Sequence, residues 1–462
     1  MMARNHDFSR MLIPAIMLFL FAFGLQAADS RLLTDSIVNP SIYPGTKRDF
    51  AVYLPERPDA ELALLLCFDG DVFSSKAAID SLTRCGAMPP TVAVFLNPGV
   101  VADGKGNALR YNRSNEFDSM TADMASFIES ELLPRVDRCL QKCGMRLSAD
   151  PDLHAAAGAS SGGIAAFTLA WRRPDLFRRV YCSVGTFVAM RGGDTYPAIV
   201  RKTDPKPLRV FLHDGRNDVW NALFGHWFEQ NTLMESALRF AGYDVAHAWD
   251  DGGHSIRGGI CEFASAMSWL WRDWQEPLVA HRSSNDMLQS ITIDGEDWQT
   301  ATAAVTFPDR SSVRTCNGRT YGRKHGPSIA LSPDNRTLVE AEEGTDWLWA
   351  SIIGDDGKPT YRQRFYWLHN AEHRADKAPR QMAFDTDGNL YVATNMGIQV
   401  CDQNGRVRAI LPLPGGVVAE AVTLQGNLLY AKSGATIYVR RLKSEGYNPP
   451  SPPVVPKSQG QG

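Results

Sequence analysis

The chain has 462 residues, more than one ordinary hydrophobic core accommodates, so we expect two domains. Hydrophobic residues make up 44% of the chain and charged residues 21%, the balance of a folded globular protein. The net charge is −3 and no basic stripe is present, which argues against binding to nucleic acid.

The first 27 residues have the pattern of a secretory signal peptide. Arg4 and Arg10 precede the apolar run MLIPAIMLFLFAFG, and cleavage is expected at the small residues near Ala27 or Ala28. A membrane anchor is the alternative, but about 14 apolar residues fall short of the roughly 20 that a spanning helix needs. We therefore expect a secreted or periplasmic protein that has no membrane attachment after cleavage.

Export would bring the eight cysteines into an oxidising compartment, where disulfides form. Cys139 and Cys143 are close enough along the chain to pair, whereas Cys67 and Cys182 lie in apolar runs typical of buried thiols. The cysteines form no CxxC motif or Cys/His cluster that would indicate zinc.

Residues 29–275 are expected to form an α/β domain. Short β-rich runs alternate with stretches of helical period, which predicts a doubly wound, mostly parallel sheet with helices on both faces. The predicted strands are LALLLCF, TVAVFL, DLHAAAG, RRVYCSVG and LRVFLHD, and the predicted helices are MTADMASFIESELLPRV, GGIAAFTLAW and TLMESALRFAGY.

The pattern changes after residue 275. Residues 276–300 contain a proline, three serines and a glycine, and are predicted to be a linker. Residues 301–443 carry short strands separated by Asp/Gly turns, which predicts a smaller all-β, propeller-like domain of about three blades at roughly 40–45 residues each. The proline-rich residues 444–462 are predicted to be a disordered tail.

The stretch GASSGG lies between a predicted strand and a predicted helix, the setting of a nucleophile elbow. That turn needs residues almost without side chains two positions before and two after the nucleophile. Ser160 has glycine at both positions, whereas Ser161 has Ala159 at one of them. Ser160 is therefore the predicted nucleophile, and the Ser161 backbone N–H would supply half of an oxyanion hole. The alternative is an ordinary small-residue turn.

A serine nucleophile needs a base and an orienting carboxylate, which follow it as Asp and then His in α/β-hydrolases. HDGRND and DDGGH both come just after predicted strands, where parallel sheets place their sites. His254 is the predicted base, with a buried structural histidine as the alternative. Asp218 is favoured as the acid because it lies beyond the strand end, where a loop can fold back to the His254 imidazole. Asp214, at the strand end, remains the second candidate.

The second oxyanion donor is expected from the loop after an earlier strand. The run LLLCFDGD ends a predicted strand, and the backbone N–H of Asp71 is the candidate there. The alternative is a plain Asp-Gly turn. Trp220, with Phe224 and Trp227, either lines an aryl-accepting substrate pocket or packs the core.

Several stretches of the first half match one family. They are YPGTKRDFAVYLP, FDGD, NRSNEFDS, GASSGG, RPDLFRRVYCSVGTF, FLHDGRND, FAGYDVAHAWDDGGH and WLW. In them the chain resembles the enterochelin-esterase-like branch of the esterase D superfamily of α/β-hydrolases. The resemblance implies a triad and an oxyanion hole on the residues already named, and no cofactor. It also places Arg113 and Glu116 near the substrate pocket, with a structural ion pair as the alternative.

The second half resembles a fragment of the SMP-30/gluconolactonase propeller family through IALSPDNRTL, AFDTDGNLYVATNMGIQVCDQNGRV and ILPLPGG. That family holds a divalent metal with Glu, Asn and Asp. Here Ser328 stands in place of the Asn, Arg380 stands in place of the Asp, and the blades for the Glu are missing. We expect no metal and no hydrolysis there. The H-x-x-E-H pattern at residues 369–373 lies between strand-like runs, so a loop is expected rather than zinc.

The sequence thus predicts a secreted serine esterase that needs no cofactor or metal. Its expected substrate is an acylated polysaccharide carrying acetyl or feruloyl esters, with a catecholate trilactone siderophore as the alternative. A glycan-binding or partner-binding protein with an inactive hydrolase domain is the competing class. A metal-dependent lactonase is disfavoured by Ser328 and Arg380.

Overall fold

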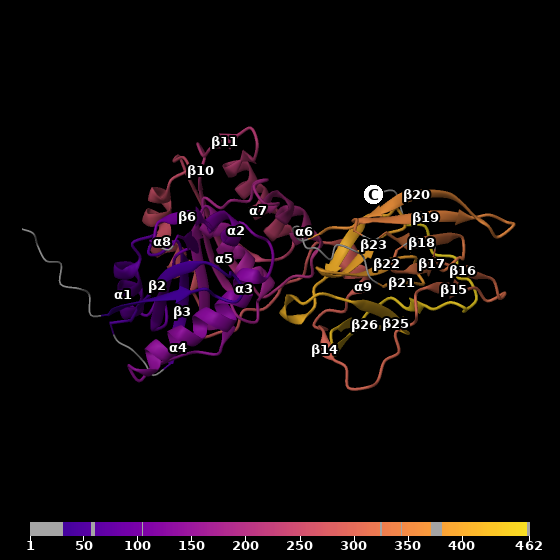
Figure 1. The fold of residues 1–462 in the computed structure, drawn as a ribbon, viewed down its shortest axis with the longest axis horizontal. Helices are drawn as coiled ribbons and strands as arrows, with labels where there is room; N and C mark the ends of the chain where they lie inside the picture. Colours follow the sequence, from indigo (N-terminus) through magenta and orange to yellow (C-terminus); the bar gives the residue numbers. More distant parts are fainter. Residues whose placement is uncertain are drawn as a thin grey trace, which may run out of the picture.

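The computed structural model describes residues 31–56, 61–103, 105–323, 326–342, 344–370 and 381–459. The predicted signal peptide, Arg380 and most of the H-x-x-E-H pattern lie outside the described residues. The ribbon has two parts, an α/β part drawn from indigo to magenta and an all-β part drawn from orange to yellow (Figure 1).

The α/β part is built on one mixed eleven-stranded sheet with the order β13-β10-β9-β8-β3-β4-β2-β5-β6, in which β1 also pairs with β2 and β7 with β3. The strands from β13 to β4 along this order are parallel, and β2 is antiparallel to β4. Their bounds are β1 Leu32–Val38, β2 Lys47–Tyr53, β3 Glu61–Phe68, β4 Thr91–Leu96, β5 Val100–Ala102, β6 Ala108–Tyr111, β7 Arg146–Leu147, β8 His154–Ala159, β9 Arg179–Ser183, β10 Arg209–Gly215 and β13 Asp244–Asp250.

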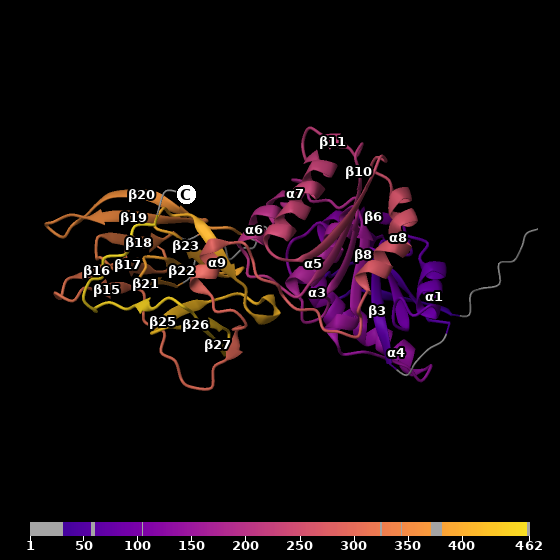
Figure 2. The ribbon, with the colours of Figure 1, turned by 180° about the vertical axis from the view of Figure 1, so that it is seen from behind.

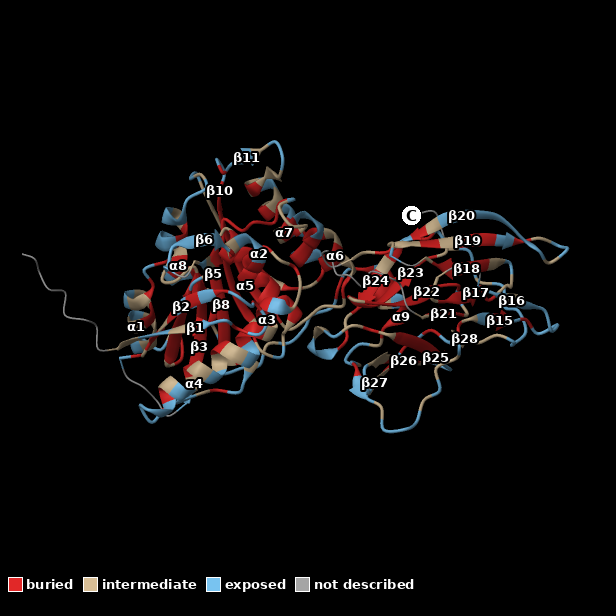
Figure 3. Cartoon of the chain, in the orientation of Figure 1, coloured by how far each residue is buried: buried red, intermediate tan, exposed pale blue. Residues whose placement is uncertain are grey.

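Helices cover both faces of this sheet (Figure 2). The bounds are α1 Lys76–Arg84, α2 Arg113–Phe117, α3 Asp123–Phe127, α4 Leu133–Gln141, α5 Ser161–Arg172, α6 Tyr196–Lys202, α7 Trp227–Phe240 and α8 Ile256–Leu270. Alternate side chains of β3 point to opposite faces of the sheet. Leu64 and Leu66 pack with α3 to α7 on one face, and Leu65 and Cys67 pack with α1 and α8 on the other. The buried strands lie between these layers (Figure 3).

The five predicted strands of this part are present as β3, β4, β8, β9 and β10. The mixed sheet, with helices on both faces, fits the predicted α/β-hydrolase architecture. The long helix predicted around residues 120–136 is present as one uninterrupted helical run, in which a π-helical segment, Ile128–Leu132, lies between α3 and α4. Pro134 at the start of α4 lacks the N–H that a regular α-helix would need there.

The β-rich part contains three antiparallel sheets of four or five strands, with the orders β17-β18-β19-β20, β24-β23-β22-β21-β28 and β14-β27-β26-β25. Strands β17 and β21 contact each other, as do β21 and β25. The bounds are β14 Gln299–Thr300, β17 Ile329–Leu331, β18 Thr337–Ala341, β19 Trp347–Ile353, β20 Pro359–Trp367, β21 Met382–Asp385, β22 Leu390–Thr394, β23 Gly397–Cys401, β24 Val407–Leu411, β25 Ala421–Gln425, β26 Leu428–Ser433, β27 Thr436–Arg441 and β28 Gly446–Tyr447. A small hairpin, β15 Ser312–Arg314 and β16 Thr320–Gly322, accompanies them.

Two segments are more ordered than the sequence indicates. The predicted linker contains helix α9, Asp286–Ile291, which Asn285 caps by accepting from the Met287 and Leu288 N–H groups at 3.0 and 3.2 Å. The predicted disordered tail begins inside a sheet, because β28 pairs with β21 and Tyr447 is buried. The Tyr447 hydroxyl also donates to Asn335 at 3.0 Å, which fixes this segment to the β-rich part.

The two parts touch where α6 packs against β24. Thr203, just after α6, forms a bridge with Ile410 of β24, and Asp204 pairs with Arg440. Asn285 at the start of α9 donates to the carbonyls of Arg201 and Arg408 at 2.9 and 2.8 Å, so one amide joins the two parts. The contact is thus made by polar bonds as well as by packing.

All eight cysteines are free thiols in the structure, so the predicted local pairing of Cys139 with Cys143 is not formed. Within the described residues, every helix is too short or too polar to cross a membrane.

Candidate active site

Ser160 occupies a sharp turn between β8 and α5. Its φ is 57° and its ψ is −121°, a conformation that a residue with a side chain rarely adopts and that marks a strained, functional turn. A Cβ on Gly158 would lie 2.1 Å from the Gly162 carbonyl oxygen, and one on Gly162 would lie 3.0 Å from the Asp69 carboxylate. The glycines that the sequence analysis required on either side of Ser160 are therefore required sterically.

Three predicted residues come together at the carboxyl ends of the parallel strands. The Ser160 Oγ lies 3.0 Å from His254 Nε2, and His254 Nδ1 lies 2.9 and 3.1 Å from the two carboxylate oxygens of Asp218. These residues follow β8, β13 and β10, respectively, so the sheet brings together positions 94 and 36 residues apart. Nδ1 bound to a carboxylate leaves Nε2 free to accept the serine proton.

The structure separates the two candidate carboxylates. Asp214 is fully buried at the end of β10, where its Oδ1 accepts from the Gly215 N–H at 2.7 Å, while the imidazole is hydrogen-bonded to Asp218. Burial, together with the adjacent Asp218, raises the pKa of Asp214 to about 9. Burial acts in the same direction on Asp218, but the hydrogen bonds from His254 and from Asp214 outweigh it, and the pKa of Asp218 is lowered. Asp218 is thus the ionised partner of the imidazole, and Asp214 is the protonated neighbour.

Ser161 directly follows the nucleophile, whereas the placement of the Asp71 N–H as the second oxyanion donor stays a prediction. Ser161 is the first residue of α5, so its N–H is among those that the helix itself does not use. Asp71 lies in the loop after β3, where its carboxylate accepts from the Ser75 N–H and hydroxyl, each at 2.7 Å. Gly162 packs against Phe68 at the end of β3, which brings this loop alongside the elbow.

Arg113 braces the elbow. Its Nε and Nη2 each lie 2.7 Å from the Asp69 carboxylate, and its Nη1 donates to the Ser161 hydroxyl at 2.9 Å. The ion pair that the sequence analysis gave as the alternative is therefore formed, and Arg113 holds the loop after β3 against the start of α5.

Glu116 does not face a substrate site, so the prediction of a substrate contact is wrong for this residue. Its side chain is fully buried and pairs with Arg48 through two contacts of 2.8 Å, and it also accepts from the Gly99 N–H at 2.9 Å. Asn112 Nδ2 donates to it as well at 3.0 Å, and a carboxylate held by four donors in the core is structural. The motif NRSNEFDS contains both glutamate and arginine, and its pattern does not reveal which points inward.

Trp220 lies at a small hairpin formed by β11 Trp220–Asn221 and β12 Gly225–His226, and it is 67% exposed. It packs no core, which removes one of the two predicted roles and leaves the substrate contact as a prediction. Trp227 at the start of α7 is buried instead and meets the His254 ring edge-on at 5.4 Å.

Thr186 is a neighbour of the nucleophile that the sequence analysis missed. Its hydroxyl lies 3.3 Å from Ser160 Oγ and accepts from the Trp227 indole N–H at 3.5 Å. A lone threonine after a strand carries no sequence pattern that would single it out.

A second serine–histidine–aspartate chain lies beneath the loop that carries the base. His213 Nδ1 lies 2.9 Å from the Ser183 hydroxyl, and its Nε2 lies 3.2 Å from Asp250. The other Asp250 oxygen accepts from the Gly252 N–H at 2.7 Å, at the start of that loop. His213 is almost fully buried, whereas the Asp250 side chain is 44% exposed, so this chain runs from the core to the start of the loop and positions it.

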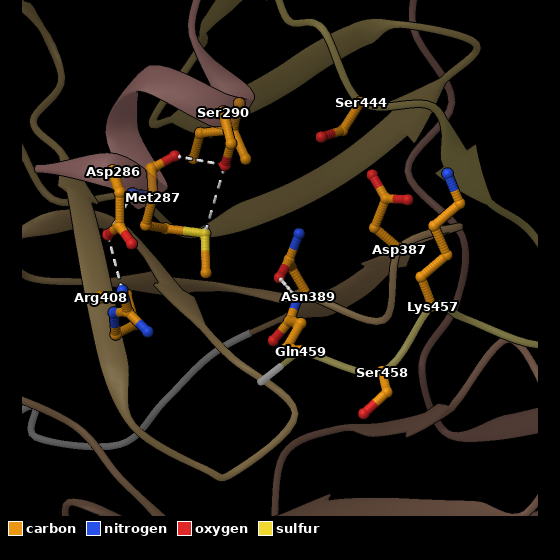
Figure 4. Close-up of a pocket in the computed structure, with 11 residues that line it drawn as sticks. Asp286, Met287, Ser290, Asp387, Asn389, Arg408, Ser444, Lys457, Ser458 and Gln459 are labelled. Carbon is orange, nitrogen blue, oxygen red and sulfur yellow. Dashed lines mark hydrogen bonds and ion pairs between the residues drawn. The ribbon is translucent and has the colours of Figure 1, made fainter. Parts of the chain in front are cut away.

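The described residues contain no cluster of three or more His, Cys, Asp or Glu side chains suited to a metal ion. A cavity of about 650 Å³ lies elsewhere, among α9, β-strand ends and the C-terminal segment (Figure 4). Polar pairs such as Asp286 with Arg408 and Asn389 with Gln459 line it, and no triad residue does. The predicted absence of a metal stays a prediction, because Arg380 is not described.

Known proteins resemble the α/β part of this chain. A curated relative, the iron(III) enterobactin esterase of Dickeya dadantii (strain 3937), is 27% identical over 225 residues, which are 44% of this chain and 47% of the relative. This chain therefore spans about half the length of that protein. Among solved structures, a ferulic acid esterase matches at 18% identity and a TM-score of 0.40, with 52% of this chain and 98% of that chain covered. An enterobactin esterase from Shigella flexneri matches at 20% identity and a TM-score of 0.39, with 52% and 59% covered.

A family model described as "Putative esterase" matches residues 41–280, which are a little over half of the chain and contain every residue of the serine–histidine–aspartate chain. The chain therefore belongs to this esterase family.

Proposed function

We propose that the protein is a serine carboxylic-ester hydrolase in which Ser160, His254 and Asp218 are the catalytic triad. One observation carries the proposal: the serine hydroxyl, the imidazole and the carboxylate form a continuous chain with contacts of 3.0 and 2.9 Å. Family membership is the independent support.

In the proposed mechanism, His254 Nε2 takes the proton of Ser160 as Oγ attacks the ester carbonyl carbon. The ionised Asp218 stabilises the imidazolium and fixes its tautomer. The backbone N–H groups of Ser161 and Asp71 stabilise the oxyanion, and each such donor is worth about 10²–10³ in kcat. His254 then protonates the departing alkoxide, which leaves the acyl group on Ser160 Oγ. A water molecule attacks this acyl group while His254 takes its proton, and His254 returns the proton to Ser160 Oγ as the acid leaves.

For the substrate we propose an acylated polysaccharide carrying acetyl or feruloyl esters, processed outside the cytoplasm. Support comes from the signal-like pattern of residues 1–27 and from the attached β-rich part, which a small substrate does not require. A catecholate trilactone siderophore is the second candidate, and it is favoured by the similarity to a protein named iron(III) enterobactin esterase.

We further propose that the β-rich part is a fragment of a β-propeller that neither binds the metal of a lactonase nor hydrolyses a substrate. Support comes from its three antiparallel sheets and from the contacts among β17, β21 and β25. Ser328, in the place of the expected metal ligand, is buried and carries no charge.

A fluorophosphonate probe tests the nucleophile in the full chain. The wild type should label at Ser160, and Ser160→Ala should not label and should lose about 10⁶ in kcat on p-nitrophenyl acetate. Ser161→Ala is the matched control, because it removes the neighbouring hydroxyl and should retain labelling. A wild type that does not label would support the competing class, a binding protein with an inactive hydrolase domain.

A small ester panel tests the substrate. The panel consists of methyl ferulate, acetylated xylan and a catecholate trilactone, each compared by kcat/KM. The polysaccharide proposal requires the xylan or the ferulate to exceed the trilactone, and the reverse order would replace it with the siderophore proposal.

A further inference from the structure

Thr186 places a buried hydroxyl within reach of Ser160, and the mechanism above does not use it. The residue lies three positions after β9 and is 2% exposed. Its Oγ1 lies 3.3 Å from Ser160 Oγ and 3.5 Å from the Trp227 indole nitrogen. Among the residues that the structure describes, these are the two hydrogen bonds of this oxygen. Hydrogen bonds at catalytic groups are often this long before substrate binds and shorten in the complex.

The direction of the hydrogen bonds around Thr186 follows from what each partner can do. An indole nitrogen only donates, so Thr186 Oγ1 accepts from Trp227 and keeps its own proton for Ser160 Oγ. Ser160 does not donate in return, because its proton is directed at His254 Nε2. That nitrogen accepts, since the imidazole holds its proton on Nδ1 against Asp218. The donors therefore all point the same way, from the indole N–H to the imidazole.

The backbone holds this hydroxyl in place. The Thr186 N–H donates to the Ser160 carbonyl at 3.2 Å, which ties the chain after β9 to the elbow. The Gly185 carbonyl accepts from the buried Asn231 amide at 2.9 Å. A Cβ on Gly185 would lie 2.4 Å from Cys182 Sγ, so the chain passes this close only with glycine there. The hydroxyl is thus oriented beside Ser160 Oγ before the reaction begins.

We propose that Thr186 is a further catalytic residue, whose hydroxyl donates to Ser160 Oγ while the acyl-enzyme is hydrolysed; this role rests on the proposed function. In that step a water molecule adds to the acyl carbon and gives a proton to His254. The bond from the acyl carbon to Oγ then breaks, its electron pair stays on Oγ, and His254 Nε2 returns the proton to Oγ. The Thr186 proton remains on Thr186 throughout and stabilises the negative charge that develops on Oγ.

The hydrogen bond from Thr186 favours hydrolysis of the acyl-enzyme more than its formation. An interaction raises a rate only as far as it is stronger in the transition state than in the state before it. In the free enzyme, Ser160 Oγ belongs to a neutral hydroxyl that already accepts the Thr186 proton. In the acyl-enzyme, Oγ is an ester oxygen whose electrons are delocalised into the carbonyl group, so it accepts poorly. It becomes a strong acceptor as its bond to the acyl carbon breaks, and loss of the Thr186 hydroxyl should therefore slow hydrolysis selectively.

Rapid mixing of the full chain with p-nitrophenyl acetate measures the two steps separately. Release of p-nitrophenolate gives the rate of acylation, and mass spectrometry of quenched samples follows the acetylated protein through its hydrolysis. Thr186→Val keeps the shape of the side chain and removes the hydroxyl. It should slow hydrolysis of the acetylated protein at least about tenfold, the loss expected for a hydrogen bond to a charged group, and leave acylation within about threefold of the wild type. The acetylated fraction of the protein should rise.

Three variants serve as controls. Thr186→Ser restores the hydroxyl and should hydrolyse the acetylated protein at nearly the wild-type rate. Trp227→Phe keeps a ring against His254 but removes the N–H that orients Thr186, so it should also slow hydrolysis more than acylation. Thr232→Val removes a hydroxyl that donates to the Glu229 carbonyl of its own helix, and both of its rates should match those of the wild type.

The outcomes separate a catalytic from a structural role of Thr186. Hydrolysis by Thr186→Val at the wild-type rate would overturn the proposed role, and so would equal slowing of both steps, which is the mark of a disturbed fold. Either result would leave the triad standing. A wild type that is neither acetylated nor labelled at Ser160 by a fluorophosphonate would instead overturn the proposed function itself.

Discussion

Replacing Asp214 by asparagine tests whether this buried carboxyl carries a proton at neutral pH. Burial and the neighbouring Asp218 raise the pKa of Asp214 from 3.8 to about 9. Between these values the folded protein keeps the proton that the unfolded chain has lost, so folding takes up one proton. The free energy of unfolding therefore falls as the pH rises through this window, by about 1.4 kcal/mol per pH unit. Between about pH 5 and about pH 8 the raised pKa of Asp214 therefore lowers the free energy of unfolding by about 4 kcal/mol.

The asparagine side chain would not titrate, and its amide can still donate where the protonated carboxyl donates. The stability of Asp214→Asn relative to the wild type should therefore improve by about 4 kcal/mol between about pH 5 and about pH 8. Urea unfolding at several pH values in that range measures the difference. Catalysis should remain within about tenfold of the wild type, because His254 is hydrogen-bonded to Asp218 and not to Asp214.

Asp218→Asn is the control, because the pKa of Asp218 is shifted in the opposite direction. The pKa of Asp218 lies below its ordinary value, so the stability that this group contributes is fully present above the unfolded pKa of 3.8 and is lost only as the pH falls below it. Because Asp218 also helps to raise the pKa of Asp214, the stability of Asp218→Asn relative to the wild type should improve from about pH 5 to about pH 8 by less than that of Asp214→Asn, while kcat falls about 10⁴-fold. Parallel pH profiles for Asp214→Asn and the wild type would refute a protonated Asp214.

Three further substitutions test the surroundings of the site. Glu116→Gln leaves Arg48 buried without its counter-charge and should cost about 3–5 kcal/mol in urea unfolding, and a cost under about 1 kcal/mol would contradict a structural role. His213→Leu breaks the chain beneath the loop of the base and should lower kcat on p-nitrophenyl acetate about tenfold, and unchanged kcat would exclude this positioning. Trp227→Leu removes the ring against His254 and should lower kcat by a similar factor at nearly constant KM, whereas a change confined to KM would make it a substrate contact.

The parallel sheet and the serine–histidine–aspartate chain were predictable because each leaves a local trace in the sequence. β3 and β4 are apolar runs of strand length, and Gly158 is required by its contact with Gly162, only four residues along the chain. Strand order then fixes the rest, since loops after neighbouring parallel strands meet at one edge of the sheet. The prediction of Asp218 and His254 rested on that rule, and their roles await the labelling and kinetic tests.

Other features of the site were not predictable because they depend on which way a side chain points. Glu116 and Arg113 are three residues apart in one short helix, yet one is fully buried and the other lies beside the elbow. Thr186 reaches the nucleophile only because the chain after β9 turns back over it, where the Thr186 N–H donates to the Ser160 carbonyl at 3.2 Å.

The contact between the two parts bears on the choice of substrate. Helix α6 connects β9 to the parallel strand β10, so it runs back from the carboxyl edge of the sheet to the amino edge. The bridge and the ion pair to the β-rich part are made by Thr203 and Asp204, after the end of this helix. Both views of the ribbon place α6 between the two parts (Figures 1 and 2). The β-rich part is thus fastened toward the edge opposite Ser160 and is not positioned to shape the reacting ester. The proposed polysaccharide is long enough to contact both parts at once, whereas a compact lactone at Ser160 would contact only the α/β part.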